Sequence, residues 1–152
     1  MVTIGIECES TEANSYGVGR NVQKLLEHLS SRKDIRIIKY FKKNIPSFSL
    51  YYYIILPLKI FFDRPDIVFF PNYMLPFGIF CKTIVVLTND LFYEMNARDI
   101  PLLYRLSYRI FAGHAKRNAT MIMTHSQSSK DDLVKKWGLD EERIVVNHLG
   151  VL

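Results

Sequence analysis

The stretch of chain from Thr120 to Val146 has the pattern of a strand, a helix and a second strand in close succession. The apolar run Met121–Thr124 is followed by Ser126, a residue type that favours the N-cap of a helix. The helix is expected to continue to Trp137, and a strand to follow in the run that ends at Val146. A helix that directly joins two strands is the usual connection of a parallel pair. This unit therefore predicts a parallel sheet.

Strand-like and helix-like patterns alternate along the rest of the chain as well. The expected strands are Val2–Cys8, Asp34–Phe41, Asp66–Phe70 and Lys82–Thr88. A turn at Gly17–Gly19 is expected to lead into a helix at Arg20–Ser31, whose apolar residues are spaced three and four apart. A chain of 152 residues is long enough for one domain with a buried core. The alternation predicts an α/β fold, a Rossmann-like doubly wound parallel sheet in a single domain.

The helix that follows Pro101 carries both aliphatic and basic residues. Proline suits the first turn of a helix because its missing N–H would have no partner there. The predicted inner face consists of Leu102, Leu103, Leu106, Ile110 and Phe111. The residues expected to point largely outward are Arg105, Arg109, Lys116 and Arg117.

The apolar segment Phe48–Phe62 is too short to cross a membrane, which takes about 20 apolar residues in a helix. Pro57 and Lys59 interrupt it, so a buried or interfacial helix is expected. The chain enters its first strand with no charged leader before an apolar run, so no secretory signal is visible. Cys8 and Cys81 have no metal-site or disulfide spacing, so we expect buried reduced thiols and a cytoplasmic protein.

The net charge of +5 and the pI of about 9.2 favour anionic partners. Phosphorylated substrates, acidic lipids and nucleic acids all meet this condition. Nucleic acid is the least favoured of the three, because the basic residues form no recognisable module with exposed aromatic residues. The charge alone does not choose between the other two.

Ligands of an open parallel sheet bind at the carboxyl ends of the strands, near a reversal of strand order. Gly17 and Gly19 precede a helix there, so the backbone of Gly17-Val18-Gly19-Arg20 could approach an anion closely. A third glycine is missing, and so is the Gly-Lys-Ser/Thr of a P-loop. A nicotinamide-dependent dehydrogenase and a nucleoside triphosphatase are therefore disfavoured.

Two further segments at the same expected edge carry polar side chains. Asn89 and Asp90 directly follow a strand, with Glu94 close behind, and they suit either the hydroxyl groups of a sugar or a local turn and helix cap. His125 could touch a ligand phosphate or satisfy a local hydrogen bond, and Ser126 is expected to be an N-cap. Position alone leaves both alternatives open.

Taken in order, these segments resemble the N-terminal half of a GT-B glycosyltransferase of the retaining family 4. The features that match are a glycine-rich turn ending in Gly19-Arg20, a polar pair after a strand, a Ser-x-x-Ser-Lys-x-x-Leu motif at Ser126–Leu133, and an acidic-Arg-Ile-x-Val run leading to Gly150-Val151. The likeness covers the whole chain and is strongest after Ile84. Two positions depart from the family: Asn89 stands where it usually has His, and Leu152 where it usually has an acidic residue.

The resemblance implies transfer of a sugar, with retention, from a nucleotide-sugar donor to a glycan or lipid-linked acceptor, as in the synthesis of cell-surface polysaccharides or glycoconjugates. Residues 1–152 would form the acceptor-binding domain, inactive alone, and a donor-binding domain would follow. No metal and no cofactor are expected. The resemblance places Asn89 and Asp90 as catalytic residues near the reacting sugar, and Gly17, Val18, Gly19 and Arg20 near the donor phosphates. The implied acceptor or cleft residues are Tyr16, Asn72, Tyr73, Glu94, His125 and Ser126.

A second hypothesis is a stand-alone α/β module that binds an anionic ligand or a membrane surface. The basic helix after Pro101 and the aromatic residues around Tyr51–Tyr53 favour it. The two hypotheses are compatible, because an enzyme that uses a lipid-linked acceptor could also lie peripherally on the inner face of an anionic membrane.

Overall fold

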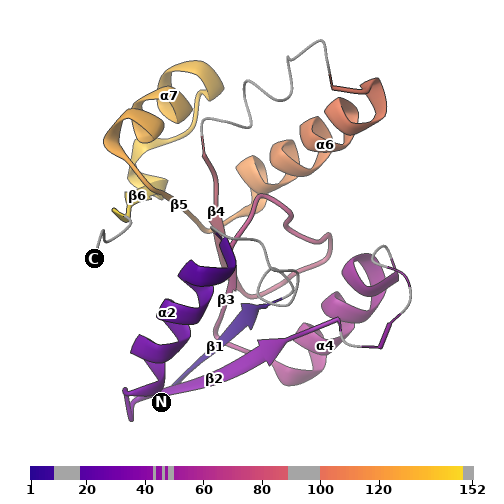
Figure 1. The fold of residues 1–152 in the computed structure, drawn as a ribbon, viewed down its shortest axis with the longest axis vertical. Coiled ribbons are helices and arrows are strands. Elements are labelled where there is room, and N and C mark those ends of the chain that lie inside the picture. The colour runs from indigo at the N-terminus through magenta and orange to yellow at the C-terminus, as the bar shows by residue number, and fades with distance from the viewer. Residues whose placement is uncertain (9–17, 43, 46, 48–49, 89–99, 149–152) are drawn as a thin grey trace. The chain divides into compact units, whose positions relative to one another are not determined.

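The computed structural model describes residues 1–8, 18–42, 44–45, 47, 50–88 and 100–148, except for the side chains of Val18, Tyr104 and Ser107. Six parallel strands form one sheet with the order β2-β1-β3-β4-β5-β6. The strands are β1 (Val2–Glu7), β2 (Ile35–Tyr40), β3 (Ile67–Phe70), β4 (Lys82–Val86), β5 (Met121–Thr124) and β6 (Ile144–Val146). The α-helices described are α2 (Val18–Ser30), α4 (Leu56–Asp63), α6 (Leu102–Asn118) and α7 (Gln127–Trp137). The predicted α/β fold with a Rossmann-like parallel sheet is confirmed (Figure 1).

The chain forms two compact units. The first consists of Met1–Pro71 and Pro76–Thr83, and the second of Asn72–Leu75 and Ile84–Leu152. The first contains β1, β2 and β3 with α2 and α4. The second contains most of β4, together with β5, β6, α6 and α7.

In the first unit, β1 lies between β2 and β3 and is parallel to both. The chain steps from β1 to β2 in one direction and from β2 back past β1 to β3 in the other. Because such crossovers are right-handed, opposite steps place the connecting helices on opposite faces of the sheet. Figure 1 shows α2 and α4 on opposite sides of β1 and β2. The reversal of strand order therefore falls between β1 and β3.

Gly5 in the middle of β1 allows a buried tyrosine to pack directly on the strand. A Cβ atom at this position would lie 2.7 Å from Cε2 of Tyr40 and 3.2 Å from Cγ2 of Val68. The first distance is too short for carbon atoms, so any larger residue would displace the ring of Tyr40. The core of this unit thus depends on the missing side chain of Gly5.

The aromatic segment is helical, as expected, and begins with a π-helical turn at Tyr51–Ile55 that continues into α4. Tyr51, Tyr52, Leu56 and Ile60 are buried on its inner side. Ile54, Leu58, Phe61 and Phe62 on the other side are at least half exposed. Within the described residues, no helix is long and apolar enough to cross a membrane. The segment therefore has a buried face and an apolar outer face.

In the second unit, β4 and β6 flank β5 as parallel neighbours. Both connecting helices step in the same direction along the sheet, and right-handed crossovers then place α6 and α7 on the same face. Their carboxyl ends are joined, because the ammonium group of Lys116 donates a hydrogen bond to the carbonyl oxygen of Trp137. Arg143 donates to the carbonyl oxygens of Lys116 and Ala119 at the end of α6. These bonds satisfy carbonyl groups that a helix end leaves unpaired.

Three details of the predicted helices are corrected. Helix α2 begins at Val18, so Val18 and Gly19 lie in its first turn rather than in the preceding turn. Pro101 occupies the N-cap of α6, one position before the helical residues. The largest correction concerns α6: Leu102, Leu103, Leu106 and Ile110 were predicted to face inward, yet they are 49–76% exposed.

The opposite face of α6 is the buried one. Ala112 and Ala115 are buried and lie about half a helical turn away from the aliphatic stripe. Phe111, the fifth residue of the predicted inner face, is half-buried. Small side chains let the helix axis approach the sheet more closely than leucine would. The prediction placed the more hydrophobic face of α6 inward, whereas the structure buries the face with the smaller side chains.

Candidate functional site

The carboxyl ends of β1 and β3 lie where the strand order reverses, the usual position of a ligand site in such a sheet. Helix α2 follows β1 along the chain, with Val18, Gly19 and Arg20 in its first turn. Gly19 is buried and Arg20 is exposed. The N–H groups of a first helical turn lack helical partners and therefore attract anions. This position suits a phosphate-bearing ligand, although a helix start alone does not identify one.

Glu7 also lies at this edge, although it was not among the site residues predicted from the sequence. It is the last residue of β1 and is 1% exposed. A carboxyl group buried to this degree has to interact within the fold, since burial of an isolated charge is costly. The signal was present in the sequence, because Glu7 is the one charged residue of the strand VTIGIE.

In the second unit, Asn72 and Tyr73 follow β3 along the chain. The Oδ1 atom of Asn72 accepts a hydrogen bond of 2.9 Å from the N–H of Met74, as in an Asx turn. The rings of Tyr73 and Tyr108 of α6 meet edge to face, with centroids 5.3 Å apart. The structure thus gives both predicted cleft residues a local structural role, and it brings Tyr73 to α6.

The turn from β5 to α7 contains the other two predicted residues that are described. Ser126 is the N-cap, as predicted: its Oγ accepts a 3.1 Å hydrogen bond from the N–H of Ser129. The side chain of His125 is half-buried. Within the part of the chain that the structure describes, Nδ1 of His125 and Oγ1 of Thr124 are buried and have no hydrogen-bond partner.

Unpaired buried polar atoms are uncommon in proteins and call for an explanation. Here two of them belong to successive residues at the carboxyl end of one parallel strand, where ligands of such sheets bind. Thr124 was not nominated from the sequence, because a threonine in a strand is ordinary. The hydroxyl and the imidazole nitrogen could pair with the hydroxyl groups of a polar ligand.

The remaining predicted site residues lie outside the described residues. They are Tyr16, Gly17, Asn89, Asp90 and Glu94. Within the described ranges, no three His, Cys, Asp or Glu side chains are grouped as metal ligands would be.

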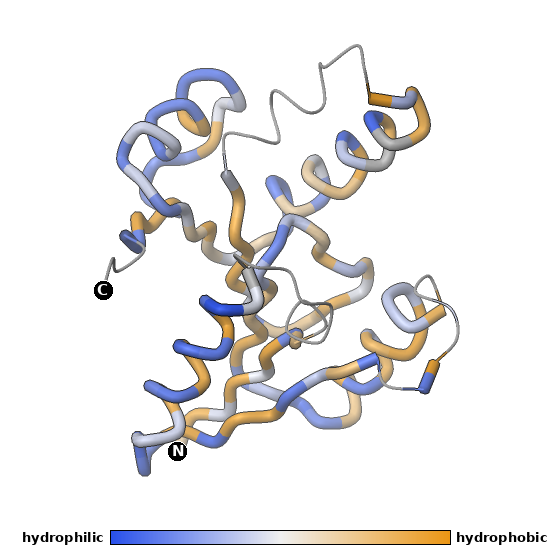
Figure 2. Tube along the Cα trace, viewed as in Figure 1, coloured by the Kyte–Doolittle hydropathy of each residue, from blue (hydrophilic) through white to orange (hydrophobic). Residues whose placement is uncertain are grey.

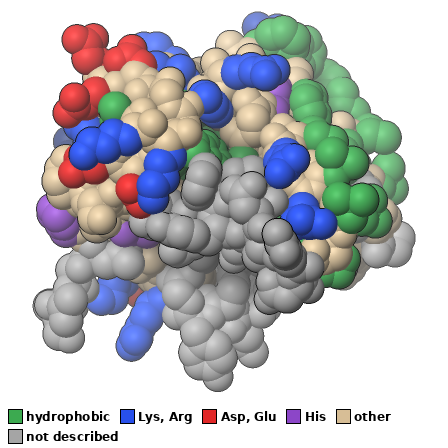
Figure 3. All heavy atoms as spheres, turned by 90° about the horizontal axis from the view of Figure 1, so that it is seen from above, with side chains coloured by type: hydrophobic (Ala, Val, Ile, Leu, Met, Phe, Trp, Pro, Cys, Tyr) green, Lys and Arg blue, Asp and Glu red, His purple; other side chains and the backbone are tan. Residues whose placement is uncertain are grey.

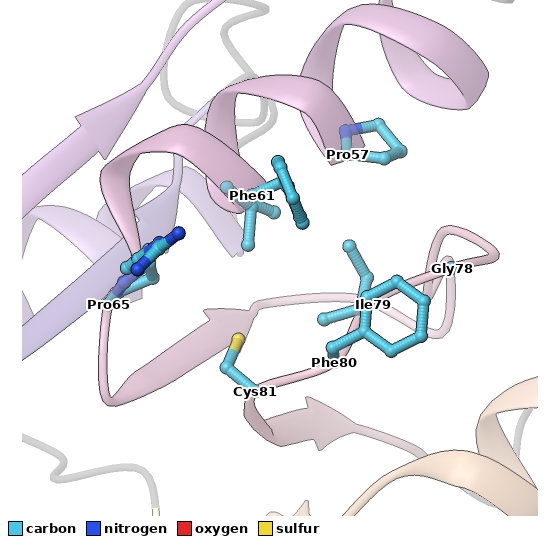
Figure 4. A pocket seen from close by; sticks show the side chains of 9 residues that line it. Pro57, Phe61, Pro65, Gly78, Ile79, Phe80 and Cys81 are labelled. Carbon is cyan, nitrogen blue, oxygen red and sulfur yellow. The ribbon is translucent and has the colours of Figure 1, made fainter.

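A pocket among the described residues lies elsewhere in the first unit (Figure 4). It has a volume of about 260 Å³ and lies between α4 and the segment that leads into the amino end of β4. Figure 4 shows Pro57 and Phe61 facing Ile79 and Phe80 across it, with the thiol of Cys81 pointing inward. Its lining is mostly carbon, so it suits an apolar group rather than a sugar or a phosphate.

Two titratable groups near this pocket are held in their neutral forms. Burial, and next the negative charge of Asp63, raise the pKa of the Tyr40 hydroxyl above its usual value. Burial also raises the pKa of the Cys81 thiol. Cys8 is fully buried, as expected, whereas Cys81 is half-buried, and the structure joins neither of them in a disulfide. These groups show no sign of activation for nucleophilic chemistry.

Neither a protein-family model nor a curated protein matches this sequence. The function therefore rests on the ordered motifs of the sequence and on the geometry at the carboxyl edge of the sheet.

Proposed function

We propose that this chain is the acceptor-side half of a retaining glycosyltransferase that moves a sugar from a nucleotide-sugar to a glycan or lipid-linked acceptor. The observation that supports this most directly is the pair of unpaired polar atoms at the end of β5, Oγ1 of Thr124 and Nδ1 of His125. A sugar presents several hydroxyl groups that both donate and accept hydrogen bonds. An acceptor bound there would satisfy both atoms.

The resemblance gives two further segments of the chain roles of their own. The first-turn N–H groups of α2 would face the donor phosphates, with Gly19 leaving room for close approach. Asn89 and Asp90, by resemblance, would contact the reacting sugar. The nucleotide-sugar acts as a substrate in this scheme, which calls for no resident metal or cofactor. The reaction would take place in the cytoplasm, at or near the inner membrane face.

The first test is the activity of the full-length gene product. It is incubated with a panel of uridine- and guanosine-diphosphate sugars and a membrane extract as the source of acceptor, and both nucleotide release and labelled product are measured. We expect transfer from one donor, and a loss of about 100-fold or more in kcat for Asp90→Asn. Asp131→Asn, on the exposed surface of α7, is the matched control and should retain activity. Absence of transfer from every donor would contradict the proposed function.

The second test addresses the end of β5. Thr124→Val removes the unpaired hydroxyl while keeping the shape of the side chain, so stability should be unchanged or increased. The KM for the acceptor should rise about tenfold, the effect of one lost hydrogen bond of roughly 1.4 kcal/mol. Thr83→Val is the control, because Thr83 is equally buried but lies near the amino end of β4. An unchanged KM in Thr124→Val would show that the acceptor does not bind there.

A further inference from the structure

Helix α6 presents its larger aliphatic side chains to solvent. Leu102, Leu103, Leu106 and Ile110 are 73%, 76%, 51% and 49% exposed. Their spacing of three and four residues places them on one face. Isolated exposed leucines are ordinary on protein surfaces, but a contiguous apolar stripe marks an interaction site.

The same helix is cationic and has no acidic residue in its 17 positions. Arg105 and Arg109 run along one border of the aliphatic stripe, and Arg117 lies near its carboxyl end. Lys116 is used inside the fold, through its bond to Trp137. Figure 3 shows hydrophobic side chains gathered along the right-hand side of the molecule with Lys and Arg side chains next to them.

A small hollow lies between the aliphatic and the arginine side chains of α6. It has a volume of about 70 Å³ and is lined by Leu102, Leu106, Arg105 and Arg109. Nε of Arg105 is buried and has no hydrogen-bond partner among the described residues. A small anionic group seated in the hollow would meet guanidinium donors on one side and methyl groups on the other.

We propose that this face of α6 docks the protein on an anionic phospholipid bilayer. The four aliphatic side chains would enter the boundary between headgroups and acyl chains, and the arginines would contact lipid phosphates. A second copy of the chain is a poorer occupant, because two such faces would bring like charges together without any acidic residue of α6 to pair with them. The docking depends only on α6 and not on the proposed sugar transfer.

The test measures flotation of the protein with vesicles of phosphatidylcholine and phosphatidylglycerol, and with vesicles of phosphatidylcholine alone. We expect binding to the anionic vesicles that falls as salt is raised, since exposed charges are screened over about 8 Å at physiological ionic strength. Leu103→Ser/Leu106→Ser should reduce the partition coefficient at least tenfold. Leu58→Ser/Phe62→Ser is the matched control, because it removes exposed apolar side chains from α4 instead.

A charge variant tests the same face without touching its apolar residues. Arg105→Gln/Arg109→Gln should lower binding about 25-fold, or about fivefold for each cation near an anionic surface. Lys33→Gln/Lys135→Gln removes the same charge from exposed positions elsewhere and should cost clearly less. Circular dichroism and thermal unfolding confirm that each variant is folded.

Three results would overturn the proposal. They are equal binding of the protein to both kinds of vesicle, a loss of binding in the α4 variant but not in either α6 variant, and self-association that the α6 leucine variant abolishes without any vesicle binding. The last would identify a second copy of the chain as the occupant. None of these results depends on transferase activity, so each proposal can fail alone.

Discussion

Helices α6 and α7 lie in the same unit, on the same face of the sheet, and are built in opposite ways. Helix α7 buries Leu133 and Ser129 and presents charged and polar residues to solvent. Helix α6 buries Ala112 and Ala115 and presents leucines. Figure 2 shows the contrast along the chain, with α7 mostly hydrophilic and α6 strongly hydrophobic at its amino end. Helix α7 thus has its apolar side chains buried or half-buried within this fold, whereas α6 exposes an apolar face to solvent.

The two helices also differ in how their ends are capped. Helix α7 starts with a serine cap and ends at Gly138, whose left-handed conformation (φ 62°) lets its N–H bond the last turn. Helix α6 starts at Pro101 with no side-chain cap and is held at its carboxyl end by Arg143. Residues next to α7 in the sequence therefore cap both of its ends, whereas α6 relies on Arg143 at its carboxyl end.

The largest effect should come from truncating one leucine in each helix. Leu133→Ala removes a side chain that is 1% exposed and should lower the free energy of unfolding by about 2–5 kcal/mol. Leu106→Ala, at a half-exposed position, should change it by no more than about 0.5 kcal/mol. Urea unfolding of both variants measures the difference. If Leu106→Ala were as costly as Leu133→Ala, the outer face of α6 would be covered in solution, and the comparison would fail.

The buried face of α6 should resist enlargement. Ala115→Leu forces three extra carbon atoms against the body of the protein and should cost about 1–3 kcal/mol. Gly113→Ala is the matched control, because a Cβ atom there would meet nothing within 4 Å. That change should stabilise the protein by about 0.5–1 kcal/mol, since alanine is the better helix former. Thermal unfolding shifts of opposite sign would support the assignment of the faces, and shifts of the same sign would contradict it.

The cap of α7 gives a smaller effect. Ser126→Ala removes the acceptor for the N–H of Ser129 and should cost about 1 kcal/mol. Ser128→Ala, two positions on and exposed, should leave stability within about 0.5 kcal/mol. Ser126→Asp keeps an acceptor and should restore most of the loss. Equal stability of the alanine variants at 126 and 128, measured by urea unfolding, would show that the cap is unimportant.

The smallest effect concerns the charges on α7. Lys136 and Asp132 form an ion pair of 3.1 Å one turn apart. Asp132→Asn should cost about 0.3–0.5 kcal/mol at low ionic strength and almost nothing at high salt. Unfolding measured at two salt concentrations tests this. A cost that persists at high salt would mean that Asp132 acts through something other than its charge.

Much of the candidate site was predictable, because it consists of strand ends and helix starts. The sequence placed His125 and Ser126 after β5, and it placed Arg20 at the start of α2. It did not identify Glu7 or Thr124, whose interest comes from burial rather than from residue type. The burial of a single polar side chain depends on what packs over it, and no local pattern records that.

The sequence by itself determined the secondary-structure elements, because helix period, strand propensity and capping act over a few residues. The strand-helix segment of β5 and α7 is an example, because its boundaries follow from the apolar run of β5 and from the caps Ser126 and Gly138. Only the tertiary structure decided the strand order and which face of α6 lies inward. Both faces of α6 carry apolar residues, and the folded chain buries the alanines and exposes the leucines. Small side chains on the inward face let a helix pack closely, and leucines there would hold it further away.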